Sequence, residues 1–181
     1  MGKRPARCYT KIGGPAYTRT QGRRNKGYIR GIPGSKVVMF DMGANDKTFE
    51  IAVDMLAKES CHIRHMALEA GRQAINRKLQ KLVGRDEYHL TLRTHPHHVL
   101  RENKMMAFAG ADRMQDGMRR SFGKPTDRAS RIKAGDAIFT ARVQAKNYEH
   151  AVAALKSARA KMPTPVYFEV SKGKELLGLN D

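Results

Sequence analysis

The sequence predicts an α+β fold: a mostly antiparallel sheet with two helices packed on one face, plus an extended basic N-terminal arm and a long basic loop. Three observations lead to this prediction. The order strand–helix–strand occurs twice, around residues 48–93 and 136–171. Ten of the first 35 residues are Gly or Pro, so little regular structure is expected there. Most of the positive charge lies outside the two strand–helix–strand units.

The first unit combines alternating apolar residues with one long helical pattern. Phe49, Ile51 and Val53 share one face of a strand at period two. Apolar positions at helical spacing mark one face of the following helix, and Gly84 is placed to end it. Strands are expected at 36–43, 47–56 and 87–94, with a helix at about 60–83 and a segment at 97–103 that can continue the sheet.

The second unit repeats this order near the end of the chain. A strand is expected at 135–145, and Asn147 is a good N-cap for a helix over 148–162. Pro163 and Pro165 end that helix, and a last strand follows at 166–171. The predicted organisation is an arm over 1–36 and a single body over 37–181, with a mobile basic loop at about 101–133.

Charge is strongly segregated along the chain. The 181 residues carry a formal net charge of +18. Residues 1–36 contain ten basic residues and no acidic one, and residues 101–133 contain nine basic and four acidic residues. Such a field attracts polyanions and says more about partners than about fold. The sequence therefore predicts a nucleic-acid-binding protein with a near-neutral body and two basic extensions.

Tyrosines in the arm favour RNA over a general polyanion. Tyr9, Tyr17 and Tyr28 alternate with Arg and Lys. An extended backbone with guanidinium groups and spaced aromatic rings suits an arm that passes between phosphates and stacks on unpaired bases. The alternative is a disordered basic tail, which would not need three tyrosines and the turn signals around Gly13 and Pro33.

Enzyme, metal and membrane functions find no support in the sequence. His95, His97 and His98 are clustered, but no Cys, Asp or Glu pattern completes a metal site; a strand-end cluster near RNA or the core is the alternative. Residues 122–126 resemble a phosphate loop only superficially. No apolar run approaches the roughly 18 residues that span a bilayer. We expect no catalytic residues, cofactor, metal or membrane partner, and a cytoplasmic location.

Residues 105–125 form an unusual stretch, rich in Met, Arg and Gly. Its apolar residues, among them Met105, Phe108 and Met114, follow neither helix nor strand periodicity. Methionine adapts to irregular partners, so an RNA surface can cover what the loop cannot bury by itself. The alternative is a loop that covers the core of its own domain.

Three motifs resemble a known family. "MGKRPARCYT" at the start, "LRTHPHHVLRENKM" at 92–105 and "AGADRMQDGMRRSFGKP" at 109–125 are similar to the large-subunit ribosomal protein family that includes archaeal L10e and bacterial L16. The resemblance covers essentially the entire chain. Because the chain ends at "LLGLND" without the extension of the eukaryotic branch, an archaeal source is expected.

The resemblance implies a structural, non-enzymatic component of the large ribosomal subunit, held among rRNA helices near the A site. The implied partners are large-subunit rRNA, tRNA at or near the A and P sites, and neighbouring ribosomal proteins. A free RNA-binding or RNA-modifying factor is the alternative function.

Two sets of site residues follow from charge, aromatic content and resemblance. The predicted rRNA-binding residues are Lys3, Arg4, Arg7, Tyr9, Lys11, Arg19, Arg23, Arg24, Lys26, Tyr28, Arg30, Arg101, Lys104, Arg119, Arg120, Lys124, Arg128 and Arg131. The resemblance implies a loop that faces tRNA and the peptidyl transferase centre, consisting of Met105, Met106, Ala107, Phe108, Ala109, Gly110, Ala111, Asp112, Arg113, Met114 and Gln115.

Overall fold

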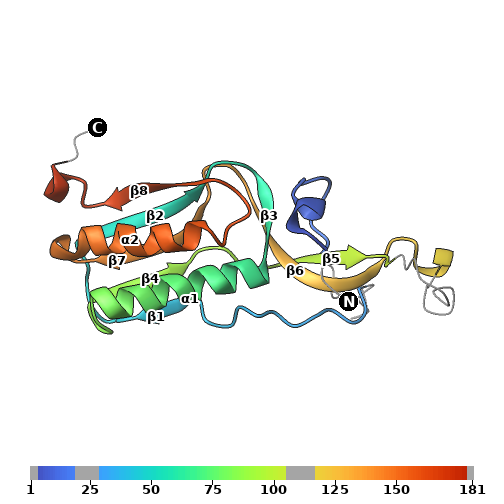
Figure 1. Ribbon diagram of the computed structural model, residues 1–181, viewed down its shortest axis with the longest axis horizontal. Helices are drawn as coiled ribbons and strands as arrows, with labels where there is room; N and C mark the ends of the chain where they lie inside the picture. The colour runs from blue at the N-terminus through green and yellow to red at the C-terminus, as the bar shows by residue number, and fades with distance from the viewer. Residues whose placement is uncertain (1–3, 19–28, 105–116, 179–181) are drawn as a thin grey trace, which may run out of the picture.

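The computed structural model describes residues 4–18, 29–104 and 117–178, and these residues form an α+β fold as predicted (Figure 1). The helices are α1 (His65–Leu82) and α2 (Tyr148–Arg159). The strands are β1 (Asp41–Gly43), β2 (Ile51–Ala57), β3 (Cys61–Arg64), β4 (Tyr88–Leu92), β5 (His98–Glu102), β6 (Lys124–Ile132), β7 (Ala137–Val143) and β8 (Val166–Lys172). Short 3-10 helices are η1 (Ala6–Tyr9), η4 (Gly117–Arg120), η5 (Ala145–Asn147) and η6 (Glu175–Leu177).

Five strands form the larger sheet, in the order β1-β4-β7-β2-β8, with antiparallel neighbours throughout. Its register aligns one apolar residue from each strand in a row across the sheet: Met42, Leu90, Ala141, Val53 and Val170. All five are buried. Because alternate residues of a strand point to opposite faces, this row marks the face that carries the core.

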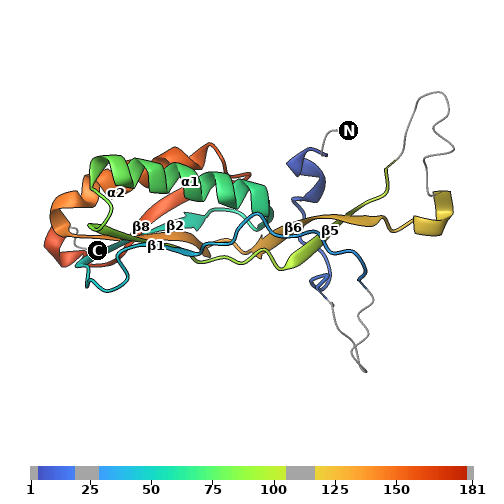
Figure 2. The same cartoon turned by 90° about the horizontal axis from the view of Figure 1, so that it is seen from below.

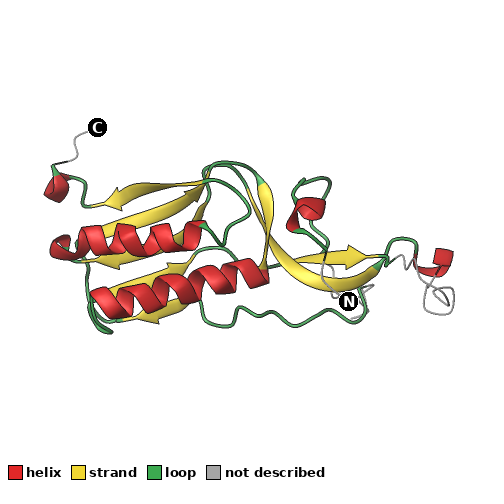
Figure 3. Cartoon of the chain, in the orientation of Figure 1, coloured by secondary structure: helices red, strands yellow, loops and turns green. Residues whose placement is uncertain are grey.

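Both helices cover that same face of the five-stranded sheet (Figures 2 and 3). From α1, Leu68, Ile75 and Leu79 are fully buried, at the spacing of one helical face. α2 buries mainly alanines, which lets it lie close to the sheet. Gly84 follows α1 with φ 106°, as its predicted role in ending the helix requires. Asn147 is the N-cap of α2, but its side chain makes no capping hydrogen bond.

The second sheet has three strands in the order β3-β6-β5 and extends beyond the helices (Figure 2). Three short connections join it to the larger sheet, at residues 58–60, 93–97 and 133–136. Hydrogen bonds tie the connections together: Gly135 N–H donates to the Ala57 carbonyl at 2.8 Å, and Ala134 N–H donates to Ser60 Oγ at 3.0 Å. Hydrogen bonds therefore hold two of the three connections together at the joint between the sheets.

A buried His–Asp contact lies where α1 meets the three-stranded sheet. His65 Nδ1 accepts the Lys36 backbone N–H at 2.9 Å, so the ring proton is on Nε2, which contacts Asp127 Oδ1. Both side chains are buried, and Asp127 Oδ1 also accepts the Arg128 N–H at 3.2 Å. The contact joins α1, β6 and the segment that precedes β1.

Three predicted boundaries in the first strand–helix–strand unit are wrong, and one is the start of β2, which begins at Ile51 and not at residue 47. The sequence predicts helix from about residue 60, but residues 61–64 form β3, because their backbone pairs with residues 129–132 of β6. The strand predicted over 36–43 is limited to β1, since only three residues pair with β4. In the preceding segment, Val38 and Met39 are largely exposed.

The predicted loop over 101–133 contains regular structure at both ends. β5 extends to Glu102, and β6 covers nine residues from Lys124. The segment predicted to continue the main sheet forms β5 in the separate three-stranded sheet. β6 was missed because the residues it buries include Asp127 and Ser130, so it lacks the apolar alternation of an ordinary strand.

Replacing Asp127 with Ala should destabilise the fold by about 1–3 kcal/mol, because the buried His65 N–H would lose its acceptor. Glu169→Ala is the matched control, since Glu169 and Lys174 form an exposed pair at 3.9 Å, which is expected to contribute less than about 1 kcal/mol. Urea unfolding of both variants measures the difference. An equal decrease in the free energy of unfolding for the two variants would show that the buried His65–Asp127 contact contributes no more to stability than an exposed ion pair.

Candidate nucleic-acid interface

The described part of the arm, residues 4–18, lies against the three-stranded sheet. His62 Nδ1 is 2.7 Å from the Tyr9 carbonyl oxygen, so it carries the proton and donates it. Arg131 Nη2 donates to the Gly14 carbonyl at 2.8 Å. Backbone carbonyls of the arm are therefore held by side chains of β3 and β6. A glycine-rich segment suits this arrangement because its backbone is open to approach.

Tyr17 extends the contact to the edge strand β5. Its backbone N–H donates to His98 Nδ1 at 2.9 Å, and its carbonyl accepts the Val99 N–H at 2.9 Å. The His98 ring proton must therefore be on Nε2. Further along the chain, Ile29 is buried although it falls within the predicted arm. The arm contacts the body through both of its described parts, since Lys36 at its end donates its N–H to His65 Nδ1.

Two arm tyrosines lie next to guanidinium groups. Arg64 lies over the Tyr9 ring, 4.8 Å from its centroid, and Arg101 lies over the Tyr17 ring at 4.1 Å. Such cation–π contacts orient both partners. Both rings are predicted from the sequence to stack on bases, and the structure gives each one a planar cation from the sheet as a neighbour.

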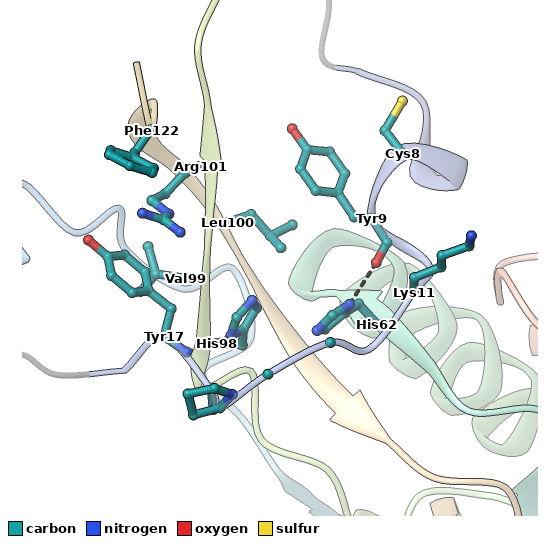
Figure 4. Close-up of a pocket in the computed structure, with 14 residues that line it drawn as sticks. Cys8, Tyr9, Lys11, Tyr17, His62, His98, Val99, Leu100, Arg101 and Phe122 are labelled. Carbon is teal, nitrogen blue, oxygen red and sulfur yellow. Dashed lines mark hydrogen bonds between the residues drawn. The ribbon is translucent and has the colours of Figure 1, made fainter. Parts of the chain in front are cut away.

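A cleft of about 510 Å³ separates the arm from the three-stranded sheet (Figure 4). Tyr9 lies on one side, and Tyr17 and Arg101 lie on the other, with Phe122 above them. His62 and His98 lie at the base. The cleft lining is Cys8, Tyr9, Lys11, Gly13, Gly14, Pro15, Ala16, Tyr17, His62, His98, Val99, Leu100, Arg101 and Phe122.

The two histidines at the base stack on each other, with ring centroids 4.7 Å apart and planes at 18°. Burial lowers the pKa of His98 to about 4, and the neighbouring His62 and Arg131 act in the same direction. Burial also lowers the pKa of His62 below its ordinary value. Both rings are therefore neutral at neutral pH, and the base of the cleft carries no positive charge.

The histidine cluster gives no metal centre in the part of the chain that the structure describes, where no three His, Cys, Asp or Glu side chains are grouped to hold an ion. His98 contacts the arm, as described above. His97 Nδ1 lies 2.9 Å from the His95 carbonyl oxygen. Cys8 and Cys61 are free thiols.

Most of the predicted rRNA-binding residues with described positions are exposed cations. Arg4 contacts Glu102 at 3.6 Å and is half exposed. Arg119 and Arg120 lie on η4, and Lys124 begins β6, at the end of the molecule that carries the three-stranded sheet (Figure 2). The exposed cations of this group are Arg4, Arg7, Lys11, Arg30, Arg101, Lys104, Arg119, Arg120 and Lys124.

Arg128 and Arg131 differ from this group because they are partly buried in β6. Arg131 holds the Gly14 carbonyl, so it acts at least in part to dock the arm. Lys3, Arg19, Arg23, Arg24, Lys26 and Tyr28 lie outside the described residues, as does the entire predicted tRNA-facing loop, Met105–Gln115.

The cleft includes residues that were not assigned to binding from the sequence. His62 pairs with Arg131 across β3 and β6, and Phe122 is 83% exposed. Phe122 precedes Gly123, which has a positive φ, and a Phe-Gly pair at a turn is a sequence signal that could have pointed to an exposed ring. His62 carries no comparable signal, because its role depends on a strand that was predicted as helix.

No helix among the described residues combines the length and apolarity needed to cross a membrane.

Comparison with known proteins places this chain in a family. Residues 15–169 match the family described as "Ribosomal protein L16p/L10e". The chain is 46% identical over 177 residues to "Large ribosomal subunit protein uL16" of Methanocella arvoryzae, covering 98% of this chain and 99% of that protein. It is 48% identical over 165 residues to the protein of the same name from Staphylothermus marinus, with 91% of each chain covered. The Archaeoglobus fulgidus protein of that name is 45% identical over 177 residues, with 98% of each chain covered.

The fold, the basic interface and these relatives together define a structural ribosomal protein of the large subunit, of the archaeal type and not an enzyme. The chain belongs to the L16p/L10e family. This confirms the resemblance drawn from the three motifs. As a member of this family, it is a component of the cytoplasmic ribosome, and rRNA binding follows from that membership.

The lowered His98 pKa makes the docking of the arm sensitive to acid. An unfolded chain binds a proton on His98 below its ordinary pKa of 6.5, whereas the folded chain resists protonation until about pH 4. The free energy of unfolding should therefore fall as the pH decreases from 6.5 towards 4, and His62 contributes in the same direction.

Measuring urea unfolding across this pH range tests the effect. His98→Gln, whose amide oxygen can accept the Tyr17 N–H, should show a smaller decline than the wild type. His150→Gln, at an exposed position on α2, is the control and should follow the wild type. A His98→Gln curve parallel to the wild-type curve would contradict the prediction.

Proposed function

We propose that this protein binds large-subunit rRNA near the A site through its arm and the basic end of the three-stranded sheet, with residues 105–115 facing tRNA and the peptidyl transferase centre. The observation that carries the proposal is the separation of charge. Residues 1–36 and 101–133 hold +15 of the net +18 charges. In the described part of these segments, the exposed cations extend over the arm, β5, η4 and the start of β6.

This arrangement supports phosphate binding by cations at fixed positions on an ordered surface, and not by the net charge of a flexible tail. Arg4, Arg7 and Lys11 are exposed on an arm whose backbone is tied to the sheet. Cations held on an ordered support lose less conformational freedom on binding than cations of a free tail. RNA phosphates that contact such a surface displace counterions, which makes the affinity depend on salt.

The salt dependence of rRNA binding tests the role of the arm. Replacing Arg23, Arg24 and Lys26 with Gln should flatten the slope of log K against log salt, by about 0.7–0.9 for each phosphate that the variant no longer neutralises. A matched variant removes three exposed cations from the helices, Arg77, Lys81 and Lys156, and should keep the slope. An unchanged slope in the arm variant would remove these three residues from the binding surface.

Deleting Met106–Gln115 tests the loop. The deletion spares every described helix and strand and all of the predicted rRNA-binding cations. The variant should fold and enter large subunits, and its defect should appear in tRNA placement or peptide-bond formation.

Thermal stability and subunit incorporation measured on the same deletion variant separate this proposal from the alternative that the loop covers the core. Exposure of the core would lower the melting temperature by about 2–4 °C for each kcal/mol of stability removed. A large drop in stability with failed incorporation would contradict a loop that faces tRNA.

A further inference from the structure

The cleft between the arm and the three-stranded sheet has the chemistry of a site for one planar ring. Its volume of about 510 Å³ lies within the range of roughly 300–1,000 Å³ typical of small-molecule sites. Its sides carry flat groups: the Tyr9 and Tyr17 rings, the Phe122 ring and the Arg101 guanidinium (Figure 4). Planar side chains on facing walls offer stacking surfaces to a planar ligand.

Phe122 is the planar side chain of the cleft that stands out by its exposure to solvent. Its side chain is 83% exposed, although phenylalanine normally contributes a large apolar area to a core or an interface. Gly123, at φ 84°, follows it and packs directly against the backbone of Glu102 and Asn103. A Cβ at Gly123 would lie 2.7 Å from the Glu102 carbonyl carbon, so the turn that displays Phe122 is sterically constrained. The ring is held at the mouth of the cleft instead of being withdrawn into the sheet.

The cations that line the cleft lie on its sides and not at its base. Lys11 and Arg101 are exposed cations, whereas the stacked pair of His62 and His98 at the base is neutral at neutral pH. A site built for phosphate would concentrate cations or backbone N–H donors at its base. This cleft instead combines a neutral base with aromatic and cationic sides, which matches a nucleobase attached to a sugar–phosphate chain.

Resting on the proposed function, we propose that the cleft is a nucleobase-binding site, which takes one unpaired base of the bound RNA between the arm and the sheet. The base stacks against the Arg101 guanidinium and the Phe122 ring, and its phosphates lie at the rim near Lys11. The site exists only when the arm is docked, because Tyr9 and Tyr17 belong to the arm and the other walls belong to the sheet.

Titration of the isotope-labelled, full-length protein with AMP tests the site, with ribose 5-phosphate as the control that lacks a base. AMP should shift the side-chain resonances of His98 and Arg101 and saturate in the millimolar range, and ribose 5-phosphate should not. Phe122→Ala should weaken AMP binding about tenfold, as expected for the removal of one base–aromatic stack. Arg101→Lys should also weaken it, because lysine keeps the charge but lacks the planar stacking surface.

Met118→Ala is the matched control, since Met118 is 87% exposed and lies outside the cleft lining. It should bind AMP like the wild type. Equal shifts from ribose 5-phosphate would overturn the proposal in favour of a phosphate site. Absence of saturation, or wild-type affinity in both cleft variants, would also overturn it.

Binding of the same variants to large-subunit rRNA distinguishes this proposal from the proposed function. If the wild-type protein binds rRNA with strong salt dependence but does not bind AMP, the nucleobase site is excluded and the rRNA-binding function stands. If the wild-type protein fails to bind rRNA, the proposed function itself is excluded.

Discussion

His65 lies where three parts of the chain meet, and both of its ring nitrogens are used. Nδ1 accepts the Lys36 N–H, and Nε2 contacts Asp127, so one neutral ring connects the segment before β1, the start of α1 and the middle of β6. Removing polar groups of this kind from water is costly unless they are paired. The two partners therefore favour a single arrangement of the smaller sheet relative to α1, and the position of the arm depends on that sheet.

The arm takes its path from side chains of the three-stranded sheet. His62, Arg131 and His98 each bond a backbone group of the arm. His98 must be neutral to accept the Tyr17 N–H, and burial lowers the pKa of this ring to about 4, which keeps it neutral at neutral pH. Interactions buried in the body thus determine where the exposed cations of the arm lie, which connects the folding of this domain with its electrostatic surface.

Apolar periodicity and the positions of helix-ending residues predicted the body well, because these signals depend only on residues close together in the sequence. The alternation of Ile51 and Val53, the helical spacing of α1 and the position of Gly84 all correspond to features of the structure. β6 and β3 were not predicted because their pairing is long-range and their sequences are polar or short. His62 and Phe122 could not be assigned to the cleft, since it forms only when residues far apart in sequence meet. The candidate rRNA-binding cations could be predicted from the distribution of charge along the chain, which does not depend on how the strands pair.

The smaller sheet projects from the joint at which hydrogen bonds connect residues 58–60 with residues 133–136, so a small rotation there moves its far end. β6 has nine residues, and at about 3.3 Å per residue it spans roughly 30 Å from the joint to its far end. A rotation of about one degree at the joint would displace that end by about 0.5 Å. The orientation of the far end therefore depends on the stiffness of this joint together with the His65–Asp127 contact in the middle of β6. Substitutions near Ser60 and Gly135 are expected to displace residues far from the substituted site.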